Sequence, residues 1–177
     1  YQQFYIGPKN EEATLSYLSA QKNLSDGKEE LALGGKTAAN PGYLGTFKDF
    51  SGTKVGKLST YNAGLLKFKA GKYQEAYDLL DQFSSNNNTL MALKYGAMAD
   101  CQANLNKSDD ALSLLDKAAS ASNDPYTSYY FTRKAGLVAL ALKKNAEAKK
   151  YFSTIDEKYQ DYDNGMSDSY IEMVKYY

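Results

Sequence analysis

The apolar positions of the chain follow a helical spacing that is clearest over residues 61–83. Four apolar residues of the second half of this stretch are spaced i, i+3, i+4 and i+7 and share one helical face. They are Ala76, Leu79, Leu80 and Phe83. The first half of the stretch also has apolar residues at helical spacing, and Gly71 lies between the two halves. A helix often ends at a residue of positive φ, which glycine adopts easily, so Gly71 marks the expected end of the first helix. The pattern predicts two helices joined by a short turn.

The apolar stripe that begins at Ala76 appears twice more, beginning at Ala111 and at Ala148. The intervals between these alanines are 35 and 37 residues, and Ala32 lies 44 residues before the first. A small residue stands twelve positions before each of the four alanines. These small residues are Ala20, Gly64, Ala99 and Gly136. A period near 34 with helix–turn–helix units is typical of tetratricopeptide repeats. A plain helical bundle is the alternative, and the fourfold offset disfavours it.

We therefore predict an all-α fold, a right-handed tetratricopeptide-repeat superhelix of about eight to nine helices, as a single domain over residues 1–177. The predicted repeats are an irregular first repeat at 10–52, regular repeats at 54–85, 89–121 and 125–158, and a capping helix at 163–176. Capping repeats of this kind close the ends of helical-repeat stacks.

The first repeat is irregular because its second helix is interrupted after Ala32. Gly34-Gly35 follows at once, Asn40-Pro41-Gly42 is a strong turn signal, and residues 43–50 then predict a short amphipathic helix. Such an interruption is typical of an insertion tolerated on a surface, and a functional loop is the other interpretation.

Local signals predict where other helices begin and end. Thr89 is the expected N-cap of its helix, and Asp124 before Pro125 predicts a capped start with proline at the first position. Residues 161–165 are expected to form a loop. Its acidic residues resemble a calcium loop, but the glycine comes one place too early for an EF-hand.

Composition excludes several function classes. The chain has 21 Lys plus Arg and 21 Asp plus Glu, so it lacks the basic excess typical of nucleic-acid binding. It contains no apolar run of about 18 residues that would span a bilayer. It has no His and a single Cys, Cys101, which removes histidine-based catalysis and His- or Cys-based zinc sites. Cys101 is interpreted as a small core residue, and no cofactor or metal is predicted.

The outward positions of the first helix of each pair predict a concave, partner-binding face. Its candidate residues are Tyr61, Leu65, Phe68, Lys69, Asp100, Asn104, Tyr130, Arg133 and Leu137. This mixture of aromatic, aliphatic and polar groups suits a peptide or a partner helix. It lacks the Lys and Arg cluster that would capture a terminal carboxylate. The alternative is that Tyr61, Phe68 and Tyr130 belong to the core.

Beyond the general repeat, the order of features resembles the YfgM-like, membrane-anchored periplasmic proteins of the Bacteroidetes. The matching segments are residues 5–8 (YIGP), 29–33 (EELAL), 42–45 (GYLG) and 61–76. The chain departs from the repeat pattern at Lys67, where Tyr is usual, and at Lys143 and Asn145, which replace the Gly and Tyr of the last turn. These departures bear on the local packing at those positions and leave the predicted fold unchanged.

The resemblance implies a periplasmic domain tethered to the inner membrane by an anchor upstream of Tyr1. This anchor is the expected contact with the membrane, and the chain itself is expected to make none. It implies an adaptor associated with the Sec translocon and with periplasmic chaperones. The expected partner is a protein or peptide, with no nucleic acid, and a homodimer stays open as an alternative.

Two other function classes remain. One is a substrate- or glycan-binding helical-repeat lipoprotein, which would carry a lipidated Cys upstream of this sequence. The other is an enzyme that works with carboxylates, Lys or Tyr alone, and no such pair converges in the pattern. We therefore predict a non-catalytic interaction module.

Overall fold

A computed structural model describes residues 7–174 of the chain. Over this range the chain is helical, and its extended pairing is limited to one isolated bridge between Thr37 and Asn40. In chain order the helices are α1 (Gly7–Ser25), α2 (Glu29–Gly34), α3 (Gly42–Phe50), α4 (Lys54–Lys69), α5 (Tyr73–Asp81), α6 (Asn88–Asn104), α7 (Ser108–Ala121), α8 (Pro125–Ala141), α9 (Asn145–Lys158), α10 (Gln160–Asp163) and α11 (Met166–Val174). The predicted all-α class is confirmed.

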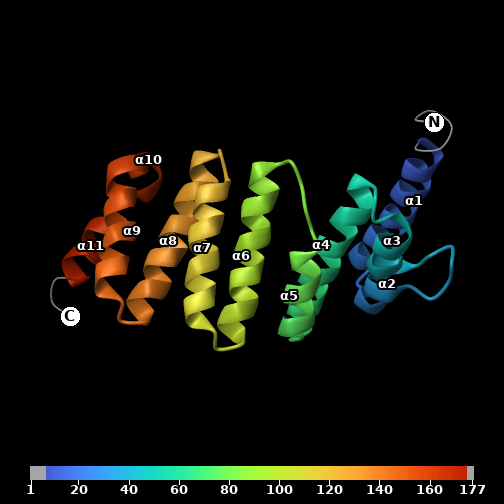
Figure 1. Cartoon of the computed structure of the whole chain (residues 1–177), viewed down its shortest axis with the longest axis horizontal. Coiled ribbons are helices and arrows are strands. Elements are labelled where there is room, and N and C mark those ends of the chain that lie inside the picture. The colour runs from blue at the N-terminus through green and yellow to red at the C-terminus, as the bar shows by residue number, and fades with distance from the viewer. Residues whose placement is uncertain (1–6, 175–177) are drawn as a thin grey trace. The chain divides into compact units, whose positions relative to one another are not determined.

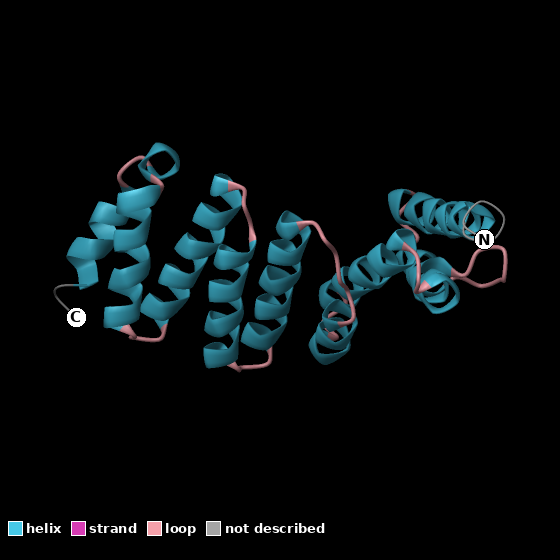
Figure 2. Cartoon of the chain, turned by 45° about the horizontal axis from the view of Figure 1, so that its top comes forward, coloured by secondary structure: helices cyan, strands magenta, loops and turns pink. Residues whose placement is uncertain are grey.

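The chain divides into two compact units, unit 1 (Tyr1–Ser85) and unit 2 (Asn86–Tyr177). Unit 1 contains α1 to α5, and unit 2 contains α6 to α11. From α6 to α9 each helix packs against the next one in the chain, and in unit 1 the pairs α3–α4 and α4–α5 do the same (Figure 1; Figure 2). The last helix, α11, packs against α9. The division falls between two predicted repeats, and the grouping of all repeats into a single domain stays a prediction.

The six helices of the regular repeats lie within the predicted repeats, except that α6 begins one residue earlier, at Asn88. The structure describes eleven helices in residues 7–174, where the sequence predicts about eight to nine. The short helix predicted at 43–50 is confirmed as α3, and the interrupted second helix of the first repeat is α2. α10 overlaps a segment predicted to be a loop. The YIGP segment lies partly outside the described residues, as does the end of the predicted capping helix, residues 175 and 176.

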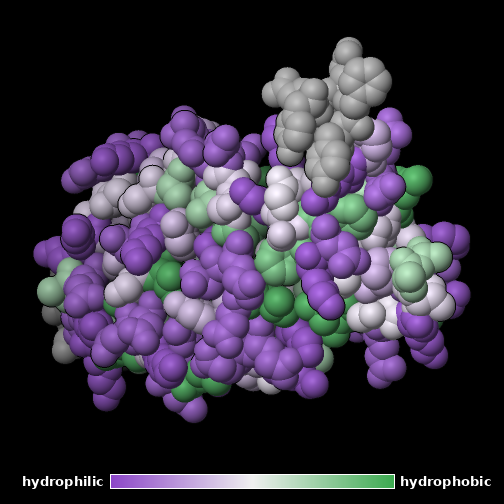
Figure 3. Space-filling view, turned by 45° about the vertical axis from the view of Figure 1, so that its right-hand side comes forward, coloured by the Kyte–Doolittle hydropathy of each residue, from purple (hydrophilic) through white to green (hydrophobic). Residues whose placement is uncertain are grey.

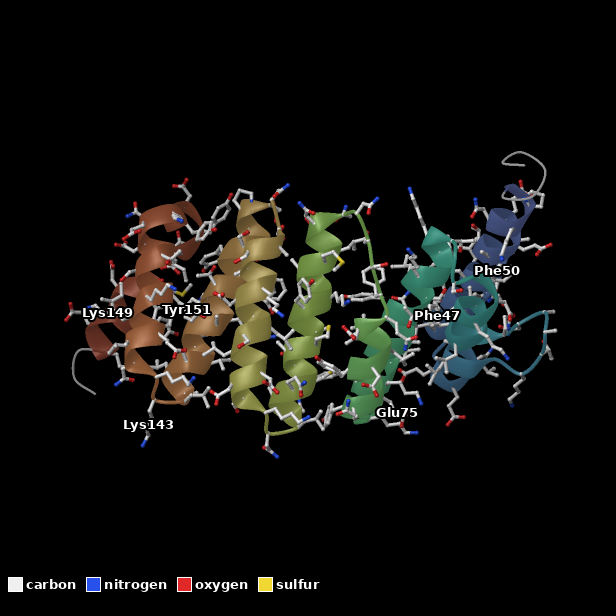
Figure 4. All side chains as sticks on the ribbon, viewed as in Figure 1. Phe47, Phe50, Glu75, Lys143, Lys149 and Tyr151 are labelled. Atoms are coloured by element: carbon white, nitrogen blue, oxygen red, sulfur yellow. The ribbon has the colours of Figure 1, made fainter. Side chains whose placement is uncertain are left out.

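One tight turn is repeated in all four helix pairs. Its residue of positive φ is Gly27, Gly71, Asn106 or Lys143, with φ between 59° and 75°. The next residue is a lysine in every case, and its amide donates to the carbonyl five residues earlier at 2.8–2.9 Å. This bond is the signature of a Schellman cap, which satisfies a carbonyl at the end of the first helix. The substitution at position 143 therefore leaves the turn intact, and the Lys143 side chain extends into solvent (Figure 4).

The small residues predicted at the helix contacts lie where paired helices touch. A Cβ added to Gly64 would lie 2.8 Å from Leu80 Cγ, and one added to Gly136 would lie 2.9 Å from the Phe152 ring. Both distances are shorter than a normal carbon contact. The pairs α4–α5 and α8–α9 therefore pack at a separation that only glycine permits at these two positions.

Two local predictions are corrected. The cap of α6 is Asn87, whose side chain accepts from the Leu90 amide at 2.9 Å, and Thr89 lies inside the helix. Part of the predicted loop at 161–165 is helical, because α10 extends to Asp163. The predicted start of α8 is confirmed, since Asp124 accepts from the Thr127 amide at 2.8 Å.

Candidate functional site

The first helices of the pairs expose large apolar side chains at positions that the core does not use. Leu93 on α6 is 40% exposed and Tyr130 on α8 is 49% exposed. The two residues are 37 positions apart and hold the same place relative to their buried small residues, Ala99 and Gly136. Leu65 on α4 of unit 1 is also exposed. Exposed apolar side chains in matching positions of repeats are typical of a surface that binds a partner.

In unit 1, the structure separates the four predicted residues of α4 into two kinds. The Tyr61 ring lies 5.2 Å from the Phe83 ring, and the Phe68 ring meets the Tyr73 ring edge-on at 5.3 Å. Both side chains are half-buried within the pair of α4 and α5, as the core interpretation predicts. Burial also raises the pKa of Tyr61.

Leu65 and Lys69 are the two predicted α4 residues that face solvent. The Lys69 ammonium forms an ion pair with Glu29 of α2. This pair links α4 to the first repeat, and a surface pair of this kind contributes little to stability.

In unit 2, Asp100 of α6 is joined to α8 by an ion pair. The Lys134 ammonium donates to both carboxylate oxygens of Asp100, at 2.6 and 2.8 Å. Asn104 is engaged within α6, where its amide donates to the Asp100 carbonyl at 2.8 Å. Lys134 was not among the predicted residues, although it directly follows Arg133 and lies 34 positions after Asp100. That spacing is close to the repeat length and could have suggested the pair.

Helices α6 and α8 approach each other closely at Gly96. A Cβ added there would lie 2.2 Å from the Phe131 ring. The Tyr130 ring meets the Phe131 ring edge-on at 5.0 Å and extends into solvent. Phe131 therefore belongs to the core between the two helices, while its neighbour Tyr130 belongs to the surface.

Arg133 and Leu137 follow Tyr130 on α8 at intervals of one turn. Both side chains are half-buried. The Arg133 Nε–H group is buried, and among the described residues it has no hydrogen-bond acceptor. Burial raises the pKa of Tyr129, and the charge of the Arg133 guanidinium opposes that shift.

A cluster of four tyrosines lies beside this surface and was not predicted. The Tyr129 ring packs against Tyr126, Tyr159 and Tyr162, with centroids 5.9 to 6.3 Å apart. Tyr126 is 58% exposed and Tyr162 is 40% exposed. The high tyrosine content was visible in the sequence, but only the packing of α8 beside α10 brings these four rings together.

Asp163 fixes the base of this tyrosine cluster. One of its carboxylate oxygens accepts from the Tyr129 hydroxyl at 3.3 Å, and the other accepts from the Ser167 amide at 2.6 Å. Asp163 is 2% exposed. The acidic residue that resembled part of a calcium loop therefore binds groups of the chain itself.

The surface of α6 and α8 offers apolar, aromatic and hydrogen-bonding groups that suit a protein or peptide. Within residues 7–174, no group of three or more metal-binding side chains converges on one point. Cys101 is fully buried, as predicted, and burial raises its pKa to about 11. The thiol is therefore held protonated and away from solvent.

No family model matches the chain, and no curated protein matches it. The fold is similar to that of MamA, a helical-repeat protein of the tetratricopeptide type. One solved MamA structure covers 93% of this chain and 87% of its own, with a TM-score of 0.61 and 15% identity. A second covers 88% and 81%, with a TM-score of 0.57 and 14% identity. The predicted tetratricopeptide fold is confirmed, and membership of the YfgM-like family stays a prediction. None of the helices within residues 7–174 is both long and apolar enough to cross a membrane.

Proposed function

We propose that this chain is a non-catalytic protein–protein interaction module, and that its partner binds the first-helix surface of unit 2, formed by α6 and α8. The observation that supports this proposal is the pair of exposed apolar side chains at matching positions, Leu93 and Tyr130. Apolar and aromatic side chains at the centre of an interface supply most of its binding free energy.

The polar groups beside Leu93 and Tyr130 define the chemistry of the partner. The Asp100–Lys134 pair is partly exposed and can donate or accept at its edge. The half-buried Arg133 guanidinium adds a positive charge beside them. A peptide or helix with an apolar side chain next to a carboxylate or a free carbonyl therefore suits this surface.

The cellular setting is proposed from the sequence resemblance. Segments 29–33, 42–45 and 61–76 resemble the YfgM-like proteins. On that basis the domain would lie on the periplasmic side of the inner membrane, tethered upstream of Tyr1. There it would act as an adaptor for the Sec translocon and its chaperones.

The test is photo-crosslinking of the full-length protein in its native envelope. A photoreactive phenylalanine analogue replaces Tyr130 in one variant and Lys117, an exposed residue of α7, in the control. We expect translocon subunits or periplasmic chaperones to be captured from position 130 and not from position 117. Serine at both Leu93 and Tyr130 is expected to abolish capture by a crosslinker placed at position 137.

Equal capture from positions 130 and 117 would contradict the proposed surface. Capture from position 130 of outer-membrane transport proteins alone would contradict the adaptor role and favour the binding lipoprotein. Capture of the chain by itself alone would favour a self-assembling scaffold.

A further inference from the structure

The inserted segment of the first repeat is held in a closed loop by its two end glycines. Gly35 and Gly42 both have positive φ, and an added Cβ at Gly35 would lie 2.0 Å from the Asn40 carbonyl oxygen. The Lys36 amide donates to that same oxygen at 3.2 Å. Neither glycine can be replaced without moving backbone atoms, so the two ends of the loop meet at a separation that only glycine permits.

The loop is also tied to α1 across the sequence. The Asn23 side chain of α1 donates to the Asn40 side chain at 3.2 Å. Farther along α1, the Ser16 and Thr46 hydroxyls are hydrogen-bonded at 2.5 Å, which joins α1 to α3. The loop is therefore fixed relative to both helices and forms one wall of the space between them.

This arrangement leaves a groove at the N-terminal end of unit 1, about 310 Å³ in volume. We call it the N-terminal groove. Its apolar lining consists of Leu15, Ala38, Ala39, Pro41 and Phe50. Figure 4 shows Phe50 at the end of α3. Figure 3, in which the right-hand side of Figure 1 comes forward, shows hydrophobic side chains exposed among hydrophilic ones.

Leu15 is the most exposed large apolar residue of the described chain that faces this groove. Its side chain is 68% exposed, and it also lines an adjoining hollow of about 390 Å³ on α1. A partner that covers this aliphatic side chain would remove apolar surface from water, which is favourable. The groove is large enough for one or two side chains.

The charges at the groove have a single sign. Glu12 and Asp49 line the groove, and Glu11 lines the adjoining hollow. Among residues 7–174, no lysine or arginine lines either space, and these three carboxylates form no ion pair. An apolar site bordered by unpaired carboxylates is complementary to an apolar side chain that is flanked by cations.

We propose that the N-terminal groove binds a peptide segment in which leucine-like side chains are flanked by Lys or Arg. The apolar side chains enter between Leu15 and Phe50, and the flanking cations lie against Glu12 and Asp49. The insertion that interrupts the first repeat thus supplies a second binding site, on unit 1, distinct from the first-helix surface of unit 2.

The probe is the fluorescein-labelled peptide Lys-Leu-Leu-Lys, measured by fluorescence anisotropy with the whole chain at about 0.05 M salt, where charge pairs are weakly screened. Two matched peptides, Glu-Leu-Leu-Glu and Lys-Ser-Ser-Lys, change only the charges or only the apolar side chains. We expect the first peptide to bind at least about tenfold more tightly than either control.

Variants of the chain locate the site. Lysine at both Glu12 and Asp49 is expected to weaken binding about tenfold, and so is Leu15→Ser. All three side chains are exposed, so these variants are expected to fold. Lysine at both Glu157 and Asp161, exposed residues of unit 2, changes the net charge equally and is expected to leave binding unchanged.

Three outcomes would overturn the proposal. They are equal binding of the lysine and glutamate peptides, unchanged binding by the groove variants, and loss of self-association on Leu15→Ser in sedimentation, which would assign the groove to a second copy of this chain. Tyr130→Ala separates the two sites. It is expected to leave peptide binding at the groove unchanged, whether or not the first-helix surface of unit 2 has the function proposed above.

Discussion

At the scale of single residues, the four turns show how different side chains satisfy one backbone requirement. Glycine takes the left-handed conformation at Gly27 and Gly71 without strain, whereas Asn106 and Lys143 take it with a Cβ present. For residues other than Gly, Asn and Asp this conformation costs about 1–2 kcal/mol. Position 143 therefore stores a small strain that the rest of its helix pair sustains.

Replacing the glycine of one of these turns is expected to lower stability, and introducing glycine at position 143 is expected to raise it. Gly71→Ala is expected to lower the free energy of unfolding by about 1 kcal/mol, because no atom lies within 4 Å of the new Cβ and only its φ of +75° opposes it. Lys143→Gly is expected to raise the free energy of unfolding by about 0.5 kcal/mol, since relief of the strain of positive φ exceeds the entropy cost of glycine. Urea unfolding measures both.

Gly52→Ala is the matched control for these turn variants. It has open space around its added Cβ and no positive φ. Stability is expected to stay within about 0.5 kcal/mol of the unsubstituted chain. A loss at position 52 as large as that at position 71 would contradict the role assigned to φ.

The corrected cap of α6 is a second test at this scale. Asn87→Ala removes the side-chain acceptor of the Leu90 amide and is expected to cost about 1 kcal/mol. Thr89→Ala removes a hydroxyl that lies 3.3 Å from Ser122 and is expected to cost less. Urea unfolding of the two variants compares their losses of stability. A larger loss for Thr89→Ala would indicate that Thr89 is the cap, as predicted from the sequence.

At the scale of helices, glycines set how closely neighbours approach. Gly96, Gly64 and Gly136 each face a bulky side chain of a neighbouring helix at a distance that leaves no room for a methyl group. Ala99 holds the equivalent position between α6 and α7, so the spacing of each pair follows from its own residues. The packing of helix on helix is therefore decided pair by pair.

Gly96→Ala is expected to destabilise unit 2 by about 1–3 kcal/mol, because the added methyl group would overlap the Phe131 ring. Gly34→Ala is the control within a helix, since nothing lies within 4 Å of its added Cβ. Alanine is a better helix former than glycine, so this control is expected to be neutral or slightly stabilising. Thermal unfolding followed by circular dichroism compares the two, and equal losses would show that helix contact is not the cause.

At the scale of the whole molecule, ionisable groups buried in both units link stability to alkaline pH. Burial raises the pKa of Tyr43 and of Tyr151 from 10.0 to about 12, and that of Cys101 from 9.0 to about 11. The folded chain therefore keeps these protons at pH values where the unfolded chain has released them. Their contribution to stability is complete below about pH 9 and is lost as the pH rises toward 12.

The free energy of unfolding is accordingly expected to fall steadily between about pH 9 and about pH 11. Urea midpoints across this range measure the slope. Phenylalanine at both Tyr43 and Tyr151 removes two of the groups, so its slope is expected to be shallower than that of the unsubstituted chain. Identical slopes would show that other groups cause the alkaline loss.

The helical pairs could be predicted because their determinants are local. The stripe from Ala76 to Phe83 and the recurring small residues specify which faces pack, whatever surrounds them. The positive φ of Gly71 and the cap at Asp124 were likewise visible, since both depend on a few neighbouring residues. The repeat register, and from it the tetratricopeptide fold, follows from the sequence alone.

The surfaces could be predicted only in part, because exposure depends on what lies opposite. Tyr61 and Tyr130 both lie on first helices, yet Tyr61 packs on Phe83 while Tyr130 extends into solvent. Which of the two tyrosines is exposed to solvent depends on the residues of the neighbouring helix, and not on its place along its own helix. The ion pair of Asp100 with Lys134 spans two helices and was missed for the same reason.

The sequence by itself determined the helical pairs, their period, the buried Cys101 and the lack of histidine chemistry, because each depends on residue type and short spacing. The tertiary structure alone decided the tyrosine cluster around Tyr129 and the N-terminal groove beside Leu15. Both join segments from different helices, and the interruption after Ala32 gave no sign of which side chains its loop would meet. Contacts between distant segments arise from packing, which a local pattern of apolar residues does not encode.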